Sequence, residues 1–159
     1  MAELRPFREL TSDGTLRFHF HPGQTRAWDS EAQTLLVLAG SQGGKTCWGP
    51  VWLDREIRRC GEGDYLVVTP TYPLLNLKLL PEFLDLFQYT LKVGKFRDKD
   101  KTFEFTRSRT RVVFGTAKNP ESLESATAKR AWLDEAGQKA FTLQAYEAVN
   151  RRLTIHSGH

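Results

Sequence analysis

Runs of consecutive apolar residues alternate along this chain with segments whose apolar residues recur every three or four positions. The first kind of segment is typical of a strand buried on both faces of a sheet, and the second of a helix that covers such a sheet. Buried strands are predicted at 34–39, 64–69 and 131–134, and helices at 45–60, 74–89, 120–125 and 141–153. This alternation favours an α/β fold with a mainly parallel sheet sandwiched by helices.

Two further features refine this pattern. Residues 101–117 alternate around a polar turn at 106–110, which predicts a β-hairpin. Proline is expected to interrupt or restart the helix 74–89 at Pro81, and the pair Gly49-Pro50 predicts a distorted first turn in the helix 45–60. Because no repeat, linker or low-complexity run separates these elements, residues 1–159 are interpreted as a single domain.

The composition is that of a globular protein that builds its core without metals or disulfides. Of the 159 residues, 40% are hydrophobic. The apolar runs are far shorter than the roughly 20 residues that span a bilayer. The N-terminus lacks the basic and then apolar pattern of a signal peptide. We therefore expect a cytoplasmic protein with no membrane association, and disordered, collagen-like and coiled-coil classes are excluded.

Positive charge is concentrated in one segment. From Leu91 to Lys118 there are nine basic and three acidic residues, a net charge of +6, whereas the whole chain has a net charge of +4. Such a segment fits either an ordinary solvated face or a surface for an anionic partner such as nucleic acid. Arg107, Arg109 and Arg111 have the i, i+2 spacing that places side chains on one face of a strand, and we predict that they contact DNA.

A glycine-rich segment lies between the predicted strand 34–39 and the predicted helix 45–60. It fits the phosphate-loop (Walker A) pattern G-x-x-x-x-G-K-[ST] at every defined position except the first, where Ala39 replaces glycine. Small residues let backbone N–H groups curl around an anion, and the helix N-terminus adds partial positive charge. The predicted nucleotide-binding residues of the loop are Gly40, Ser41, Gln42, Gly43, Gly44, Lys45 and Thr46.

Each position of this loop has an expected role. Lys45 would reach the β- and γ-phosphates, and the Thr46 hydroxyl would bind Mg²⁺. Ala39 is acceptable if it keeps a strand-like φ while the three glycines 40, 43 and 44 supply the unusual dihedral angles. The alternative interpretation is a glycine-rich turn that ends in a surface lysine.

Two acids follow the third predicted strand. Asp134 comes 88 residues after Thr46, and Glu135 is next to it. At the end of a buried strand (Walker B), Asp134 would hold Mg²⁺ and Glu135 would activate water as a general base, so Glu135 and Lys45 are the predicted catalytic residues. An Asp-Glu pair by itself often only begins a helix. The second acid favours a hydrolase over a small-molecule kinase.

Five segments taken together resemble, in order, the ATPase domain of bacteriophage terminase large subunits, the motors that package DNA into viral capsids. The segments are 20–24, 38–46, 67–72, 113–123 and 126–137, and the resemblance extends over residues 16–153. It implies a RecA-like (ASCE) P-loop NTPase core that hydrolyses Mg-ATP. It also implies double-stranded DNA as cargo, portal protein and small terminase subunit as partners, and a homo-oligomeric ring (pentamer) in the host cytoplasm.

The resemblance also assigns a role to one residue ahead of the loop. Gln24 matches the glutamine that reads the adenine edge, a role that suits an amide with both a donor and an acceptor. Taken alone, Gln24 fits a helix-start residue better.

The sequence departs from the family pattern at three points. Glu124 occupies the position where many members carry an arginine that acts on a neighbouring subunit, and Arg130 is only a weak substitute. Many members have a basic residue where this loop has Ser41-Gln42. The chain also stops before the coupling strand, the lid and the nuclease domain of the family. We therefore expect a truncated ATPase domain with an exposed sheet edge and no nuclease domain.

Two other functions also fit the sequence. A non-catalytic fragment that binds nucleotide or DNA is favoured by the missing coupling strand and the unassigned arginine. A helicase-like DNA translocase belongs to the same ATPase class, but the pattern from Asn119 to Gly137 points away from it.

Overall fold

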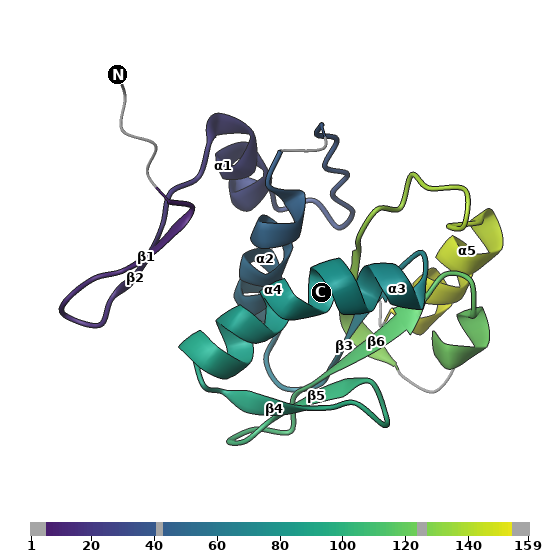
Figure 1. Cartoon of the computed structure of the whole chain (residues 1–159). Coiled ribbons are helices and arrows are strands. Elements are labelled where there is room, and N and C mark those ends of the chain that lie inside the picture. The colour runs from purple at the N-terminus through teal and green to yellow at the C-terminus, as the bar shows by residue number, and fades with distance from the viewer. Residues whose placement is uncertain (1–5, 41–42, 124–126, 154–159) are drawn as a thin grey trace, which may run out of the picture. The chain divides into compact units, whose positions relative to one another are not determined.

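The computed structural model describes residues 6–40, 43–123 and 127–153 (Figure 1). The chain divides into two compact units, residues 1–48 and residues 49–159.

The second unit is built on a five-stranded mixed sheet. The strands are arranged in the order β4-β5-β6-β3-β7, with bounds β3 Asp64–Thr69, β4 Gly94–Arg97, β5 Thr102–Phe105, β6 Arg111–Thr116 and β7 Ala128–Leu133. β3 pairs in parallel with both β6 and β7, whereas β4, β5 and β6 form an antiparallel meander. The α/β fold is confirmed, and β5 and β6 are the predicted hairpin. β4 was not predicted.

Side chains of β3 enter the core on both faces of the sheet. On one face Leu66 and Val68 pack with Leu123, Ala128 and Val149 of the following elements. These come from the 3-10 helix η3 (Pro120–Leu123), from β7 and from the helix α5 (Leu143–Arg152), which begins at the cap residue Thr142 as the pattern 141–153 predicts.

An aromatic cluster covers the opposite face. The rings of Phe83 and Phe87 stack at 4.3 Å, and the ring of Phe83 meets those of Phe103 and Phe114 edge-on at 5.3 and 4.9 Å. The helices therefore sandwich the sheet, as predicted.

The helical segment that supplies Phe83 and Phe87 is continuous but changes its winding. It consists of α3 (Tyr72–Leu74), the π-helix η1 (Leu75–Leu79), α4 (Leu80–Leu84) and the π-helix η2 (Asp85–Thr90). Pro81, which has no N–H to donate, is the second residue of α4 and follows the π-helix η1 almost directly. The predicted interruption at Pro81 is thus a change of helix type, since π turns commonly occur where the regular ladder is disturbed.

The helix α2 (Lys45–Cys60) passes through Gly49 and Pro50 without a break, so the predicted distortion is not observed. A Cβ atom on Gly49 would lie 2.0 Å from the indole of Trp132 on β7. Glycine is therefore present in the helix because it lets α2 approach β7 closely.

β7 is longer and more exposed than predicted. It begins three residues before Ala131, and its residues after Ala128 are half-buried. Within the described ranges its outer side carries only an isolated parallel bridge between Ala128 and Leu153. β7 is thus an edge strand of the described sheet.

The first unit contains a small antiparallel hairpin and one short helix. These are β1 (Arg8–Leu10), β2 (Leu16–Phe18) and α1 (Pro22–Asp29). The prediction of a strand at 34–39 is wrong, because among the described residues this segment joins neither sheet. Leu36 is 75% exposed and Leu38 85% exposed. An apolar run becomes a strand only where a neighbour pairs with its backbone groups.

Candidate nucleotide site

The glycine-rich loop makes a tight turn into α2. The N–H of Gly43 donates to the carbonyl of Gly40 at 2.9 Å, and Gly44 has φ +68°, which favours glycine. α2 begins at the next residue, Lys45. Ser41 and Gln42, which were predicted to bind nucleotide, lie outside the described residues.

Local packing accommodates Ala39, which stands where the phosphate-loop pattern has glycine. A Cβ atom on Gly43 would lie 2.6 Å from the Cβ of Ala39. Gly43 is therefore required for space, whereas Gly44 is required for its dihedral angle. Gly44, with its positive φ, supplies one of the unusual dihedral angles that were expected of the loop glycines.

Two kinds of hydrogen-bond donor lie at the start of α2. The first amides of a helix have no partner within the helix, and the aligned peptide dipoles add positive potential there. The Lys45 ammonium lies beside this end and donates to the carbonyls of Ala39 at 2.7 Å and Gly40 at 3.2 Å. Thr46 is the second residue of the helix and is half-buried. This donor set fits a phosphate chain.

Gln24 lies against the same loop. Its side-chain Oε1 accepts a hydrogen bond from the N–H of His21 at 3.1 Å, which makes Gln24 part of a capping box at the start of α1. Its Nε2 is 3.1 Å from the position of a Cβ on Gly44, and the residue is buried. Gln24 is thus a helix-start residue that also contacts the loop. The contact of His21 with the loop was not predicted.

Asp134 and Glu135 belong to the second unit and follow β7 directly. The Asp134 N–H donates to the carbonyl of Val68 at 2.9 Å, and the residue is 6% exposed. Because β3, β6 and β7 are parallel, these acids leave the sheet at the edge formed by the carboxyl ends of the three strands. Ligands of open α/β sheets bind at this edge.

The backbone of Glu135 is strained. Its φ is +54°, a left-handed conformation that costs a non-glycine residue roughly 1–2 kcal/mol. Such strain persists only where the surroundings hold it, and it is frequent at functional sites. The carbonyl of Glu135 accepts a hydrogen bond from the Gln138 N–H at 3.1 Å, which fixes the turn after β7.

The described residues can supply oxygen ligands for Mg²⁺, although they hold no cluster of three or more His, Cys, Asp or Glu side chains that could cage a metal. Mg²⁺ does not need such a cage. It commonly binds one or two carboxylates together with phosphate oxygens and water. Each unit contains a side chain with oxygen of this type, the Thr46 hydroxyl in the first and the Asp134 carboxylate in the second.

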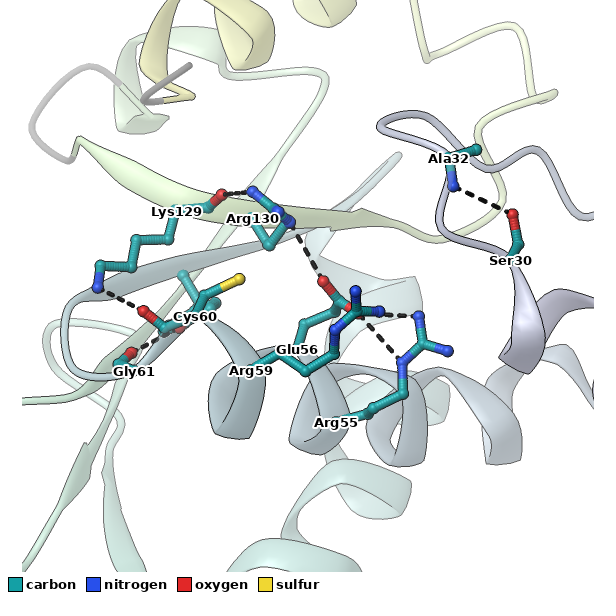
Figure 2. A network of polar contacts seen from close by, with 10 residues as sticks. Ser30, Ala32, Arg55, Glu56, Arg59, Cys60, Gly61, Lys129 and Arg130 are labelled. Carbon is teal, nitrogen blue, oxygen red and sulfur yellow. Dashed lines mark hydrogen bonds and ion pairs between the residues drawn. The ribbon is translucent and has the colours of Figure 1, made fainter. Parts of the chain in front are cut away.

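Arg130 is held within its own unit. Its Nε donates to the buried Glu56 at 3.2 Å, and its Nη1 donates to the Lys129 carbonyl at 2.8 Å (Figure 2). Arg55 also pairs with Glu56 at 2.9 Å, and Arg59 approaches it at 3.7 Å. A buried carboxylate strongly requires such partners. Arg130 is therefore an ion-pair partner of Glu56, and Glu124 lies outside the described residues.

The three arginines predicted to contact DNA do not share a strand face. β5 ends at Phe105, so Arg107 and Arg109 lie in the bend that joins it to β6 and are exposed. Only Arg111 lies on a strand, and it forms two hydrogen bonds with Asp64, at 2.9 and 2.5 Å. These bonds raise the pKa of Arg111 above its usual value. Arg111 thus differs from the other two.

Within the described ranges no helix is both long enough and apolar enough to span a membrane.

No protein-family model matches this sequence, and no relative was found among curated proteins. Similar solved structures do exist. The large terminase ATPase domain of Thermus phage P74-26 gives a TM-score of 0.73 at 17% identity, over 89% of this chain and 62% of that chain. A mutant of that domain gives 0.67 at 18% identity, over 89% and 63%. The large terminase of a second, thermophilic bacteriophage gives 0.67 at 13% identity, over 87% and 37%.

The chain therefore spans less than two thirds of each of these proteins. At such low identity the likeness shows the fold. The fold of this chain is that of phage large terminase ATPase domains.

Proposed function

We propose that this chain is the ATP-binding and ATP-hydrolysing core of a viral DNA-packaging motor. The observation that carries the proposal is a phosphate loop that leads into a 16-residue helix in a chain with the terminase ATPase fold. Under this proposal the phosphates bind at residues 40–46, and Gln24 reads the adenine edge.

The proposed roles follow from the chemistry of the residues. Lys45 and the amides at the start of α2 would stabilise the charge that develops on the transferred phosphoryl group. Thr46 and Asp134 would hold Mg²⁺, which neutralises phosphate charge when it is bound. Glu135 would orient and deprotonate the attacking water. The strained backbone of Glu135 supports this assignment, because it is a feature frequently found at functional sites.

The proposed partners come from the likeness to terminases. They are double-stranded DNA, a portal protein, a small terminase subunit and further copies of the chain in a ring, within the host cytoplasm. For DNA, the exposed Arg107 and Arg109 are better candidates than Arg111, whose guanidinium already pairs with Asp64.

A second candidate function is a fragment that binds nucleotide without turnover. It is favoured by the environment of Arg130, which is held by Glu56 and leaves the trans-acting arginine unassigned. Nucleotide binding is common to both candidates, and only hydrolysis separates them.

Phosphate release from Mg-ATP, measured over a range of protein concentrations, tests the first candidate. We expect release that rises faster than linearly with concentration, because subunits of an oligomeric motor complete one another's sites. Lys45→Ala is the blank and should lose a charge-assisted phosphate contact. Glu135→Gln should abolish release and keep ATP binding. Binding without release in the wild type would favour the second candidate, and no binding at all would contradict both.

Duplex DNA binding as a function of salt tests the proposed DNA contact. Replacing both Arg107 and Arg109 by alanine should reduce the slope of log K against log salt by about 2, roughly one per lost phosphate contact. Arg111→Ala is the matched control and should leave the slope nearly unchanged. An unchanged slope in the double variant would exclude the hairpin from the DNA surface.

A further inference from the structure

The sequence His21-Pro22-Gly23-Gln24 has a specific local geometry at the start of α1. The Nδ1 atom of His21 accepts hydrogen bonds from the N–H groups of Gly23 at 3.1 Å and of Gln24 at 3.3 Å. An acceptor nitrogen carries no proton, so a neutral ring carries its proton on Nε2. The capping contact therefore determines which tautomer His21 adopts.

The other ring nitrogen faces the phosphate loop. Nε2 of His21 lies 3.4 Å from the carbonyl oxygen of Gly43, a long contact in which Nε2–H is the donor. Both contacts require the same tautomer, so the ring can make them together. His21 thus links the start of α1 to the loop across 22 residues of sequence.

The neighbouring residues leave room for this arrangement. A Cβ atom on Gly23 would lie 3.0 Å from Cε1 and 3.2 Å from Nδ1 of His21, so glycine leaves space for the ring. Pro22 occupies the first turn of α1, where its missing N–H is harmless. Gln24 closes the capping box and contacts Gly44, the residue after the one that His21 contacts.

We propose that His21 is a positioning residue of the nucleotide site, which holds Gly43 and Gln24 in one arrangement so that the phosphates and the purine base of one nucleoside triphosphate are bound by a single rigid unit. This inference rests on the proposed nucleotide-binding function. His21 touches no phosphate itself and acts through the loop carbonyl and the capping box.

A substitution that keeps the cap and removes the reach to the loop tests this role. Asparagine is a good N-cap residue, but its side chain is too short to reach the Gly43 carbonyl from position 21. His21→Asn should therefore melt like the wild type and bind Mg-tripolyphosphate, a probe without a base, about 3- to 10-fold more weakly. His21→Ala loses both contacts and should melt at a lower temperature as well.

His19 offers a matched control, because its ring contacts Glu9 at 3.2 Å. His19→Asn should leave tripolyphosphate affinity unchanged. If His21→Asn binds the probe as tightly as the wild type does, the positioning role is wrong while the nucleotide site stands. If the wild type and Lys45→Ala bind neither ATP nor tripolyphosphate, the proposed function fails and this inference fails with it.

Nitrogen NMR of the histidine rings provides a second test. A residue that only caps α1 would not be expected to respond to the probe in this measurement. The His21 ring should show an unprotonated Nδ1 and a protonated Nε2, and its Nε2 signal should shift when tripolyphosphate is added, while that of His19 stays in place. A proton on Nδ1 of His21, or no shift on addition of the probe, would overturn the proposal.

Discussion

Two apolar runs of this chain have similar sequence patterns but differ in secondary structure and burial. Residues 64–69 form β3, whose residues after Asp64 are all buried and which pairs with strands on both sides. Residues 34–39 join no sheet in the described part of the chain, and most of their side chains are exposed. The difference shows that hydrophobicity marks a possible strand, whereas available neighbours determine whether it forms. The sheet and the loop segment should therefore respond differently to substitution.

The largest predicted difference compares one leucine from each run. Leu66 is fully buried in the core, and Leu36 is 75% exposed. Leu66→Ala should lower the free energy of unfolding by about 2–5 kcal/mol, because it removes buried methyl groups and leaves a cavity. Leu36→Ala should change it by less than about 0.5 kcal/mol. Urea denaturation of both variants measures this, and equal losses would mean that residues 34–39 are also packed into the core.

The second prediction concerns the contact between α2 and β7. Gly49→Ala should destabilise the protein by about 1–3 kcal/mol, because the added methyl group would overlap the Trp132 ring. Replacing glycine by alanine within a helix usually increases stability, so the expected change has the opposite sign.

Gly137→Ala is the control, because a Cβ atom there meets nothing within 4 Å. It should change stability by less than about 0.5 kcal/mol. A Gly49→Ala variant as stable as the wild type would show that α2 and β7 are not in close contact.

The fold of the second unit followed largely from patterns that local physics makes reliable. The buried strand 64–69, the hairpin and the helices all appeared near their predicted positions. β4 was missed because only Phe96 marks it as apolar, with Lys95 and Arg97 on either side. Short elements with so little periodic signal depend on the strand beside them, which the sequence alone does not identify.

For the candidate site, the sequence supplies residue types and their spacing but not the geometry. The loop and the acids were proposed from their spacing, because a phosphate site would need those residue types in that order. The close approach of Gly43 to Ala39, the positive φ of Glu135 and the ring contacts of His21 were not foreseen. Each of them depends on how the backbone turns, which a pattern of residue types does not specify.

The third prediction separates stability from function at Glu135. Glu135→Gly should stabilise the protein by roughly 1 kcal/mol, because glycine adopts a φ of +54° without strain. It should also abolish phosphate release if Glu135 is the general base. Glu135→Gln should lose release without gaining stability, since glutamine keeps the strain.

Lys92→Gly is the matched control, because Lys92 has the same φ of 54° and no role in the proposed site. It should be stabilised to a similar degree and keep full phosphate release. Thermal melting and phosphate release of the three variants measure both effects. A Glu135→Gly variant less stable than the wild type would show that the side chain contributes more than the strain costs.

The smallest predicted effect concerns alkaline pH and again contrasts the sheet with the loop segment. Tyr65 on β3 is fully buried, and its hydroxyl donates to the Gly61 carbonyl at 2.6 Å. Burial, and then the neighbouring Cys60, raise the pKa of Tyr65 from 10.0 to about 12. Because the folded state holds this proton more tightly than the unfolded chain does, the protonated phenol stabilises the fold. This stabilisation is complete below pH 10 and is lost as the pH rises toward 12.

Tyr65→Phe should therefore be about 1 kcal/mol less stable than the wild type at neutral pH, through the lost hydrogen bond. It should also lose less stability than the wild type between pH 10 and 12. Urea denaturation across this range, with Leu36→Ala as a variant that keeps the wild-type dependence, measures the difference, and parallel curves for Tyr65→Phe and the wild type would show that this phenol titrates as it does in the unfolded chain.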